Sequence, residues 1–282
     1  MGAAFAHCGG ASIRGKRRVM VRRRSRGRGL VALGGVLVRG GPAAKIAIGF
    51  GVACVLGFCG LAVVFARRGS APALAGLPVL ASTALAFGVG VLIAFAGSMR
   101  AFRHDADQGI DLLMRARGVG PGGYLWARLA GLTVTLGCVV GGGTALVGVV
   151  ATLLARGGVP ALRTGQSAVA ATAFALAFAV TLAPVAMATL GSRSRGGGYL
   201  ALAAVLVIPE LVAPTLAQVI PPRWAEVCSI PGALIALREA LSPGNVDLHA
   251  LGRASAVLLG VILLAVLVIR AELSRSHRSP AT

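Results

Sequence analysis

The chain has 282 residues, of which 56% are hydrophobic and only 13% are charged, and its mean hydropathy is +0.85. This composition excludes an ordinary soluble enzyme or binding module and predicts an all-α polytopic membrane protein. The net charge of +20 does not indicate a nucleic-acid partner, because 11 of the 28 Lys and Arg residues precede residue 46 and most of the others flank apolar runs, where they set topology and meet anionic lipid headgroups.

Six apolar runs are long enough to cross the hydrocarbon core, because a helical span needs about 20 apolar residues. We expect the spans at about 46–66, 75–99, 130–154, 168–190, 199–220 and 250–270. They form one six-span membrane domain over 30–272, which begins with a short interfacial helix ending near Arg39. A basic arm expected to be disordered (1–29) precedes this domain and a short tail (273–282) follows it, while the start of translation is open between Met1 and Met20.

The distribution of basic residues predicts the orientation in the membrane. With the N-terminus inside, 21 Lys and Arg residues lie on the inner side and seven on the outer side, and without the arm the ratio is ten to seven. We therefore expect a multi-pass protein of the plasma (inner) membrane with both termini in the cytosol. Residues 100–128 would then be cytosolic, and residues 221–250 would face outward.

Glycines and one proline indicate how the spans pack. Gly137 and Gly141 form a small-xxx-small pair in the third run, and the first run holds four more glycines, so both runs are suited to close helix contact. Pro184 predicts a kink in the fourth run.

The fifth run differs from the others because Glu210 sits near its middle, between Pro209 and Pro214. An ionisable group at that depth is a functional-site hypothesis by default. The two prolines remove backbone donors and predict that the helix opens there. These three residues are our candidates for a translocation path; the alternative is that the span ends or bends early and leaves Glu210 in a wet vestibule. No basic residue of another span is an evident partner for it.

Between the fifth and sixth runs, the sequence predicts a helix that begins near Pro231 and stops at 242–244. This segment is too short to cross the bilayer and too apolar for an open loop. We therefore expect a re-entrant or interfacial helix before the last span.

The charged stretch 100–129 separates the second and third runs and contains a short predicted helix over 105–117. Asp105 and Asp107 lie near its start, basic residues lie near its end and Gly118 follows as a C-cap, an order that suits the helix dipole. Its apolar stripe, spaced i, i+3 and i+4, consists of Ile110, Leu113 and Met114. A short amphipathic helix exposed in the cytosol is suited to docking in a groove on another protein.

This stretch resembles the cytosolic loop of type-2 ATP-binding-cassette exporter permeases. In that family an acidic residue, any residue and Gly lead into an aliphatic helix, a Pro-Val-Ser-like turn, and then Tyr-Leu and a base. The matching positions here are Asp107 to Gly109, Leu112 to Met114, Gly118 to Gly120, Tyr124, Leu125 and Arg128. Three positions depart from the pattern: Ile110 replaces the usual hydroxyl residue, Gly118 the proline and Gly120 the serine.

The resemblance implies that 105–117 is a coupling helix that docks on a separate ATPase subunit. The docking residues would be Asp105, Asp107, Gly109, Ile110, Leu113, Met114 and Gly118. It also implies that two permease copies, identical or different, form the path within the lipid bilayer. The only lysines, Lys16 and Lys45, lie in no G-x-x-x-x-G-K-[ST] loop, so we expect no cofactor and no enzymatic activity in this chain, with ATP and Mg bound by the partner.

Two other functional classes stay open. An ATP-independent secondary transporter or channel could use Glu210 as a proton site. A membrane-embedded enzyme is the weaker alternative, because the four histidines lie outside the span centres and no nucleophile motif or metal-spaced histidine pair is present. The sequence does not identify the substrate or the direction of transport, although the apolar spans favour a hydrophobic or amphipathic cargo.

Overall fold

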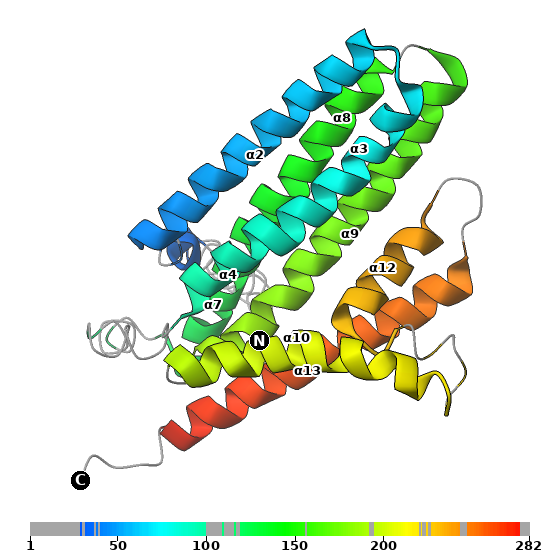
Figure 1. The fold of residues 1–282 in the computed structure, drawn as a ribbon. Coiled ribbons are helices and arrows are strands. Elements are labelled where there is room, and N and C mark those ends of the chain that lie inside the picture. The colour runs from blue at the N-terminus through cyan, green and yellow to red at the C-terminus, as the bar shows by residue number, and fades with distance from the viewer. Residues whose placement is uncertain are drawn as a thin grey trace, which may run out of the picture.

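The computed structural model in Figure 1 describes residues 29, 32–36, 38, 40–99, 109, 116, 119–155, 157–191, 195–219, 221, 224, 227–242 and 247–276. Within these residues the regular elements are all helical: α2 (Pro42–Arg67), α3 (Ala71–Ala84), η1 (Leu85–Gly90), α4 (Val91–Ser98), α7 (Pro121–Leu136), η2 (Gly137–Gly142), α8 (Gly143–Leu154), α9 (Gly158–Leu190), α10 (Arg195–Leu216), α12 (Ile230–Ala240) and α13 (Leu248–Ser276). The segments η1 and η2 are π-helical and continue the flanking α-helices.

Six of the resulting helices are long and apolar enough to cross a membrane, which confirms the all-α polytopic prediction. They are Pro42–Arg67, Ala71–Ser98, Gly122–Leu154, Gly158–Leu190, Gly197–Leu216 and Leu248–Glu272. The largest difference from the expected bounds is in α9, which begins ten residues before the predicted 168. Residues 158–167, which lie before the predicted span, are helical. The chain reverses at Gly157 and Gly158, with φ of 60° and 64°, and Pro160 then fits the first turn of the helix.

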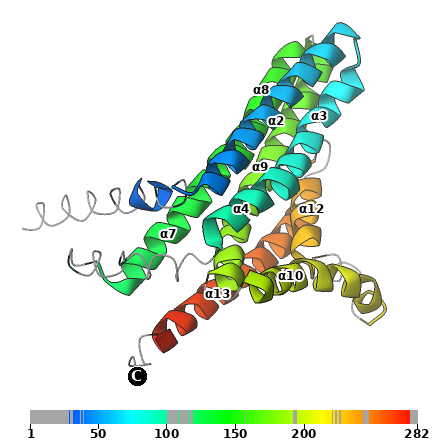
Figure 2. The same ribbon diagram turned by 60° about the vertical axis from the view of Figure 1, so that its left-hand side comes forward.

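Four long helical segments, α2, α3 with α4, α7 with α8, and α9, run side by side as a bundle (Figures 1 and 2). The core lies around α9, which packs against the other segments. It is the most buried span, because 61% of its most apolar 18-residue stretch lies inside the protein. Its central residue Phe174 is fully buried, as are Leu85 of η1 and Leu132 of α7. α9 also runs without interruption through Pro184, where the sequence predicted a kink.

Close contacts in the bundle use some of the expected glycines. A Cβ at Gly141 would lie 2.5 Å from Cδ2 of Leu176 on α9, and one at Gly51 would lie 2.8 Å from side-chain atoms of Val89 and Val139. These positions confirm the expectation of tight helix packing. The expectation was wrong for the other glycines of α2, which have nothing within 4 Å of a Cβ because they lie on its outer face.

The short interfacial helix expected before the first span corresponds to helical residues 32–36. They cross α7 so closely that a Cβ at Gly34 would lie 1.8 Å from the carbonyl oxygen of Ala127. Reciprocally, a Cβ at Gly131 would lie 2.2 Å from the carbonyl carbon of Gly34. Only glycine allows two backbones to approach to this distance.

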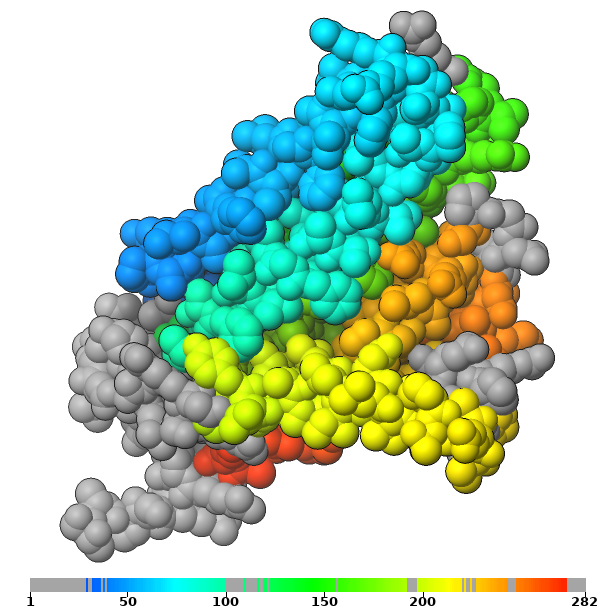
Figure 3. Space-filling view, in the orientation of Figure 1, coloured from blue at the N-terminus to red at the C-terminus, as the bar shows by residue number. Residues whose placement is uncertain are grey.

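The last three helices form a second group on one side of the bundle. α12 and α13 pack against each other and against α9, whereas α10 contacts α9 and α12 and extends away from the bundle in both ribbon views (Figures 1 and 2). α12 begins at Ile230 with Pro231 in its first turn and ends at Ala240, which agrees with the predicted helix before the last span. Figure 3 shows α10 as a ridge that lies open along the front of the molecule.

Candidate functional site

Most of the predicted coupling residues lie outside the described residues. These are Asp105, Asp107, Ile110, Leu113, Met114 and Gly118. Gly109 is described, with a φ of 67°, and a Cβ there would meet nothing within 4 Å. This left-handed conformation strains any other residue even though the space around it is open, which gives the Gly of the acidic-x-Gly pattern a backbone reason.

Glu210 lies in the fifth spanning helix, and its side chain is exposed. The helix α10 continues through Pro209 and Pro214, so the expected opening at the two prolines was wrong at the level of secondary structure. The prolines still remove hydrogen bonds, because a proline provides no N–H for the carbonyl four residues earlier. For Pro214 that carbonyl belongs to Glu210 itself.

The carboxylate of Glu210 has a defined partner at the start of α12. The Ser229 hydroxyl donates a hydrogen bond to Oε2 of Glu210 and accepts one from the backbone N–H of Gly232, with N and Oγ 2.9 Å apart. Ser229 is the N-cap of α12 and is 1% exposed. The partner that the sequence did not reveal is therefore a capped helix N-terminus, whose partial positive charge suits a carboxylate.

The other end of α12 brings a base to the middle of the bundle. Arg238 is partly buried; its Nη1 donates a hydrogen bond to Oγ1 of Thr83 at 3.1 Å, and its Cζ lies 5.3 Å from the ring centroid of Phe174. Phe174 is the central residue of the 33-residue α9, and Thr83 lies near the middle of the span Ala71–Ser98. Arg238 thus lies at mid-depth between two spanning helices, where an ionisable group marks a functional-site candidate.

These two contacts define what α12 does in the fold. Glu210 of α10 meets its N-terminus, and Arg238 lies in its last turn, so opposite charges complement both ends of the helix dipole. The inner face of α12, which includes Ala233 and Leu234, is fully buried. Because Arg238 of α12 reaches the middle of the span Ala71–Ser98 and of α9, the position of α12 fits the re-entrant alternative better than the interfacial one. We call Glu210, Ser229, Arg238 and Thr83 the α12 polar contacts.

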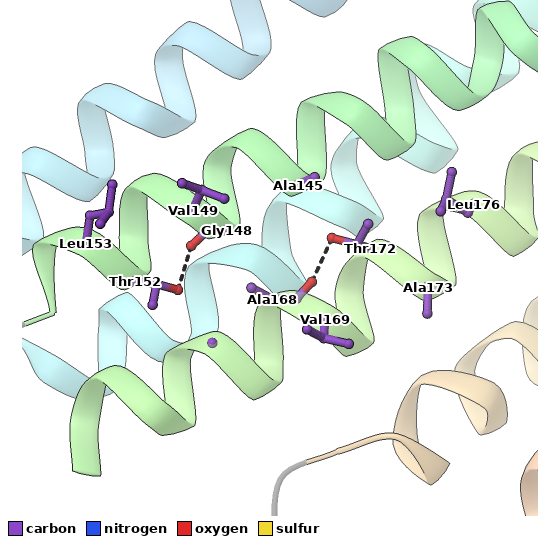
Figure 4. A pocket seen from close by; sticks show the side chains of 11 residues that line it. Ala145, Gly148, Val149, Thr152, Leu153, Ala168, Val169, Thr172, Ala173 and Leu176 are labelled. Atoms are coloured by element: carbon purple, nitrogen blue, oxygen red, sulfur yellow. Dashed lines mark hydrogen bonds between the residues drawn. The ribbon is translucent and has the colours of Figure 1, made fainter. Parts of the chain in front are cut away.

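An apolar groove of about 580 Å³ lies between α8 and α9 (Figure 4). At the bottom of the groove the two helices are in close contact, because a Cβ at Gly148 would lie 2.6 Å from Cβ of Ala168. The hydroxyls of Thr152 and Thr172 donate to carbonyls of their own helices, at 2.8 and 2.7 Å, so these two hydroxyls are used within their own helices. This groove can accept an apolar chain in the membrane but offers no chemistry.

Compared with protein-family models, with curated proteins and with solved structures, the chain has no match in any of the three. The residues themselves establish a multi-pass α-helical membrane protein. Everything more specific is inferred from the α12 polar contacts and from the family resemblance of 100–129.

Sequence reasoning missed Arg238, Ser229 and Thr83. The signal for Arg238 was available, because it is a base in an otherwise apolar helix that the sequence placed in or on the membrane. For Thr83 there was no signal, since a threonine in a spanning helix normally bonds its own backbone, as its hydroxyl also does here to Val79 at 3.0 Å.

Side chains that can ligate metals or form disulfides also occur among the described residues. No group of three His, Cys, Asp or Glu side chains among them is arranged to hold a metal ion. Cys54, Cys59, Cys138 and Cys228 are free thiols. What the α12 polar contacts can do is hold the ends of α12 against α10 and the bundle and orient charged side chains there.

Proposed function

We propose that this chain is the membrane-spanning permease subunit of an ATP-driven exporter. Two copies, identical or different, form the path, and a separate ATPase subunit binds ATP and Mg and docks on the 105–117 segment. The protein lies in the plasma membrane with both termini in the cytosol. The chain itself carries out no covalent step, and its cargo is a hydrophobic or amphipathic compound.

The observation that supports this function most directly is the exposure of α10. Only 6% of the most apolar part of α10 is buried, against 61% for α9, and α10 exposes Glu210 within its last two turns. An ionised group facing lipid inside a span is unfavourable, whereas it is tolerated against protein or a water-filled cavity. A second copy packed against α10 would provide that environment and create a path between the two subunits.

The cytosolic stretch adds independent support. Its acidic-x-Gly pattern contains Gly109, whose left-handed backbone tolerates no side chain without strain. Basic-residue counting places this stretch on the cytosolic side, where an ATPase subunit would meet it. The resemblance to the exporter loop rests on sequence, and the backbone at Gly109 explains why this position of the pattern is a glycine in this chain.

The α12 polar contacts suggest how movement passes to α10. Within the described residues α10 contacts α9 and α12, and α12 is held in the bundle by Arg238. A displacement of the bundle by the ATPase would move α12, which would pull on Glu210 through Ser229. The weakly packed α10 is then the helix most able to shift relative to the others.

The experiment is purification of the tagged chain from membranes of its source organism, followed by measurement of ATP hydrolysis in the eluate. We expect vanadate-sensitive hydrolysis that co-elutes with the chain and with one second polypeptide. The matched control is the variant Leu113→Asp, which places a charge on the predicted docking stripe and should insert in the membrane but elute without this activity. Equal hydrolysis with both proteins contradicts the proposal.

A proton-coupled transporter is the second candidate, and the Glu210 contact favours it. A carboxylate that is held by a helix N-terminus and carried on a loosely packed span can bind and release a proton as that span moves. Flux in vesicles that depends on an imposed pH gradient, needs no ATP and is lost in Glu210→Gln would select this function. Flux that requires ATP and survives Glu210→Gln would reject it.

A further inference from the structure

A second polar site, separate from the α12 polar contacts, lies at the C-terminal end of α12, against the start of α13. It is a hollow of about 730 Å³ between the two helices. The alanines Ala236, Ala240 and Ala250 line it and provide methyl groups rather than longer side chains. Its remaining lining consists of charged or titratable side chains, Glu239, Asp247, His249 and Arg253.

Among the described residues, no hydrogen bond or ion pair joins the charged side chains of this hollow to one another. No hydrogen bond or ion pair joins the side chain of Glu239 to a described residue, although Arg253 lines the same hollow. Asp247 uses a single oxygen, Oδ1, to accept the backbone N–H groups of His249 and Ala250, at 2.9 and 3.0 Å. Acidic and basic side chains therefore line one hollow, and both kinds can still form hydrogen bonds with a ligand.

Arg253 provides a second, independent observation. Its Nε is buried and has no hydrogen-bond partner. Buried donors in proteins are nearly always satisfied, so an unsatisfied one calls for an acceptor that the chain does not supply. Arg253 lies in the second turn of α13 and lines the hollow. One acceptor group in the hollow would therefore lie beside its guanidinium.

The position and chemistry of the hollow together indicate the class of ligand. It lies where the spanning helix Leu248–Glu272 begins, and its charged lining calls for water or polar headgroups rather than hydrocarbon. A phosphate suits the guanidinium of Arg253, an ammonium group suits the carboxylates of Glu239 and Asp247, and short methylene groups suit the alanines. A headgroup that carries both charges on a short linker satisfies all three.

We propose that the hollow between α12 and α13 binds the zwitterionic headgroup of a membrane phospholipid, with its phosphate at Arg253 and its ammonium group at Glu239 and Asp247. A bound lipid would fix α12 against α13 at the end of α12 opposite to its contact with Glu210. This binding is independent of the proposed transport function and can be tested without knowledge of the cargo or of the ATPase.

The test uses the full-length protein, freed of lipid in detergent, and native mass spectrometry to count added lipids. The probes are dihexanoyl phosphatidylethanolamine, dihexanoyl phosphatidylglycerol and glycerophosphoethanolamine, which has the headgroup but no acyl chains. We expect one tightly bound phosphatidylethanolamine and weaker binding of the other two. Because hydrogen bonds to charged groups are involved, Glu239→Gln should weaken phosphatidylethanolamine about tenfold and leave phosphatidylglycerol unchanged.

Arg253→Gln should weaken both lipids, because both carry the phosphate. The matched control is Arg163→Gln, an exposed base near the start of α9, which should bind as the wild type does. If Arg253→Gln fails to fold, Glu239→Gln still tests the proposal through the ratio of the two lipid affinities, because Glu239 is exposed. The proposal is overturned if wild type and Glu239→Gln bind the two lipids in the same ratio. A lipid as the ligand is overturned if glycerophosphoethanolamine binds as tightly as phosphatidylethanolamine.

Discussion

The hydroxyl of Ser229 donates a hydrogen bond to the carboxylate of Glu210 and thereby ties the most exposed spanning helix to the buried start of α12. The same hydroxyl caps α12 through the N–H of Gly232 at 2.9 Å. A single side chain thus both starts a helix and holds its neighbour. Loss of this hydroxyl should affect two elements at once.

Ser229→Ala removes an N-cap and a buried partner of a carboxylate, so we expect it to lower the free energy of unfolding by about 1–2 kcal/mol. Unfolding in mixed micelles with increasing sodium dodecyl sulfate measures this change. The matched control is Ser98→Ala, because the Ser98 hydroxyl is buried with no hydrogen-bond partner and its loss should be neutral or stabilising. Equal destabilisation by the two variants would refute the role of Ser229.

Arg238 and Phe174 should be energetically coupled. A cation over an aromatic ring contributes about 0.5–2 kcal/mol, the upper values applying when the pair is desolvated, and Phe174 is fully buried. We expect a double-mutant cycle of Arg238→Met and Phe174→Leu, measured by the same unfolding assay, to give a coupling energy of about 1 kcal/mol. The control cycle pairs Arg238→Met with Phe95→Leu, whose ring packs against Tyr199 instead, at 5.2 Å between centroids. That second cycle should be additive; equal coupling in both would argue against the contact.

Glycines that look alike in the sequence should respond in opposite directions to alanine. At Gly148 a Cβ would lie 2.6 Å from Cβ of Ala168, so Gly148→Ala should destabilise the bundle by about 1–3 kcal/mol. At Gly57 nothing lies within 4 Å of a Cβ, so Gly57→Ala should stabilise α2 by about 0.5–1 kcal/mol through helix propensity. Thermal unfolding of the purified variants measures both effects, and a shift of the same sign in the two would contradict the packing described for α8 and α9.

Asp247 predicts a defined pH dependence. Hydrogen bonds from the backbone N–H groups of Ala250 and His249, with the charge of Arg253, lower the pKa of its carboxyl below its ordinary value. A group whose pKa is lowered on folding stabilises the protein above its unfolded pKa of about 3.9, and this contribution is lost as the pH falls through the folded value. Asp247→Asn keeps a capping oxygen but does not titrate. We therefore expect unfolding curves of wild type to lose stability relative to Asp247→Asn below about pH 4, whereas curves that stay parallel would rule out this role.

The six spans and the α12 helix could be predicted from sequence because each depends on local properties. Apolar runs of sufficient length specify spans, and Pro231 in a first turn specifies the start of α12. The start of α9 was predicted ten residues late because Arg163 and the polar residues beside it are typical of a loop. In the structure these residues form the first turns of a longer helix.

The α12 polar contacts could not be predicted, because they depend on how helices pack. Glu210 and Ser229 lie 19 residues apart, and Arg238 and Thr83 lie 155 apart, so neither pair shares a local pattern. No base in another span is an evident partner for Glu210 in the sequence, whereas the structure satisfies this carboxylate with a hydroxyl at a helix N-terminus. The base that was present, Arg238, lies in a re-entrant helix that was not counted as a span.

The coupling hypothesis leads to a prediction at Gly109. Its φ of 67° lies in the left-handed region, where a side chain costs about 1–2 kcal/mol, so Gly109→Ala should distort the acidic-x-Gly turn although the space around it is open. We expect this variant to reach the membrane in normal amounts and to lose at least half of the ATPase activity that co-purifies with the wild type. Membrane fractionation and hydrolysis in the eluate measure the two quantities.

Gly120→Ala is the matched control, because it makes the same chemical change in the same connection at a residue with a φ of −69° and equally open space. An alanine is unstrained there, so this variant should keep the partner activity. A loss of activity in both variants would mean that the whole connection is sensitive to added bulk. Retention in both would show that the backbone at Gly109 does not matter for docking, and the exporter reading of 100–129 would then rest on its side chains alone.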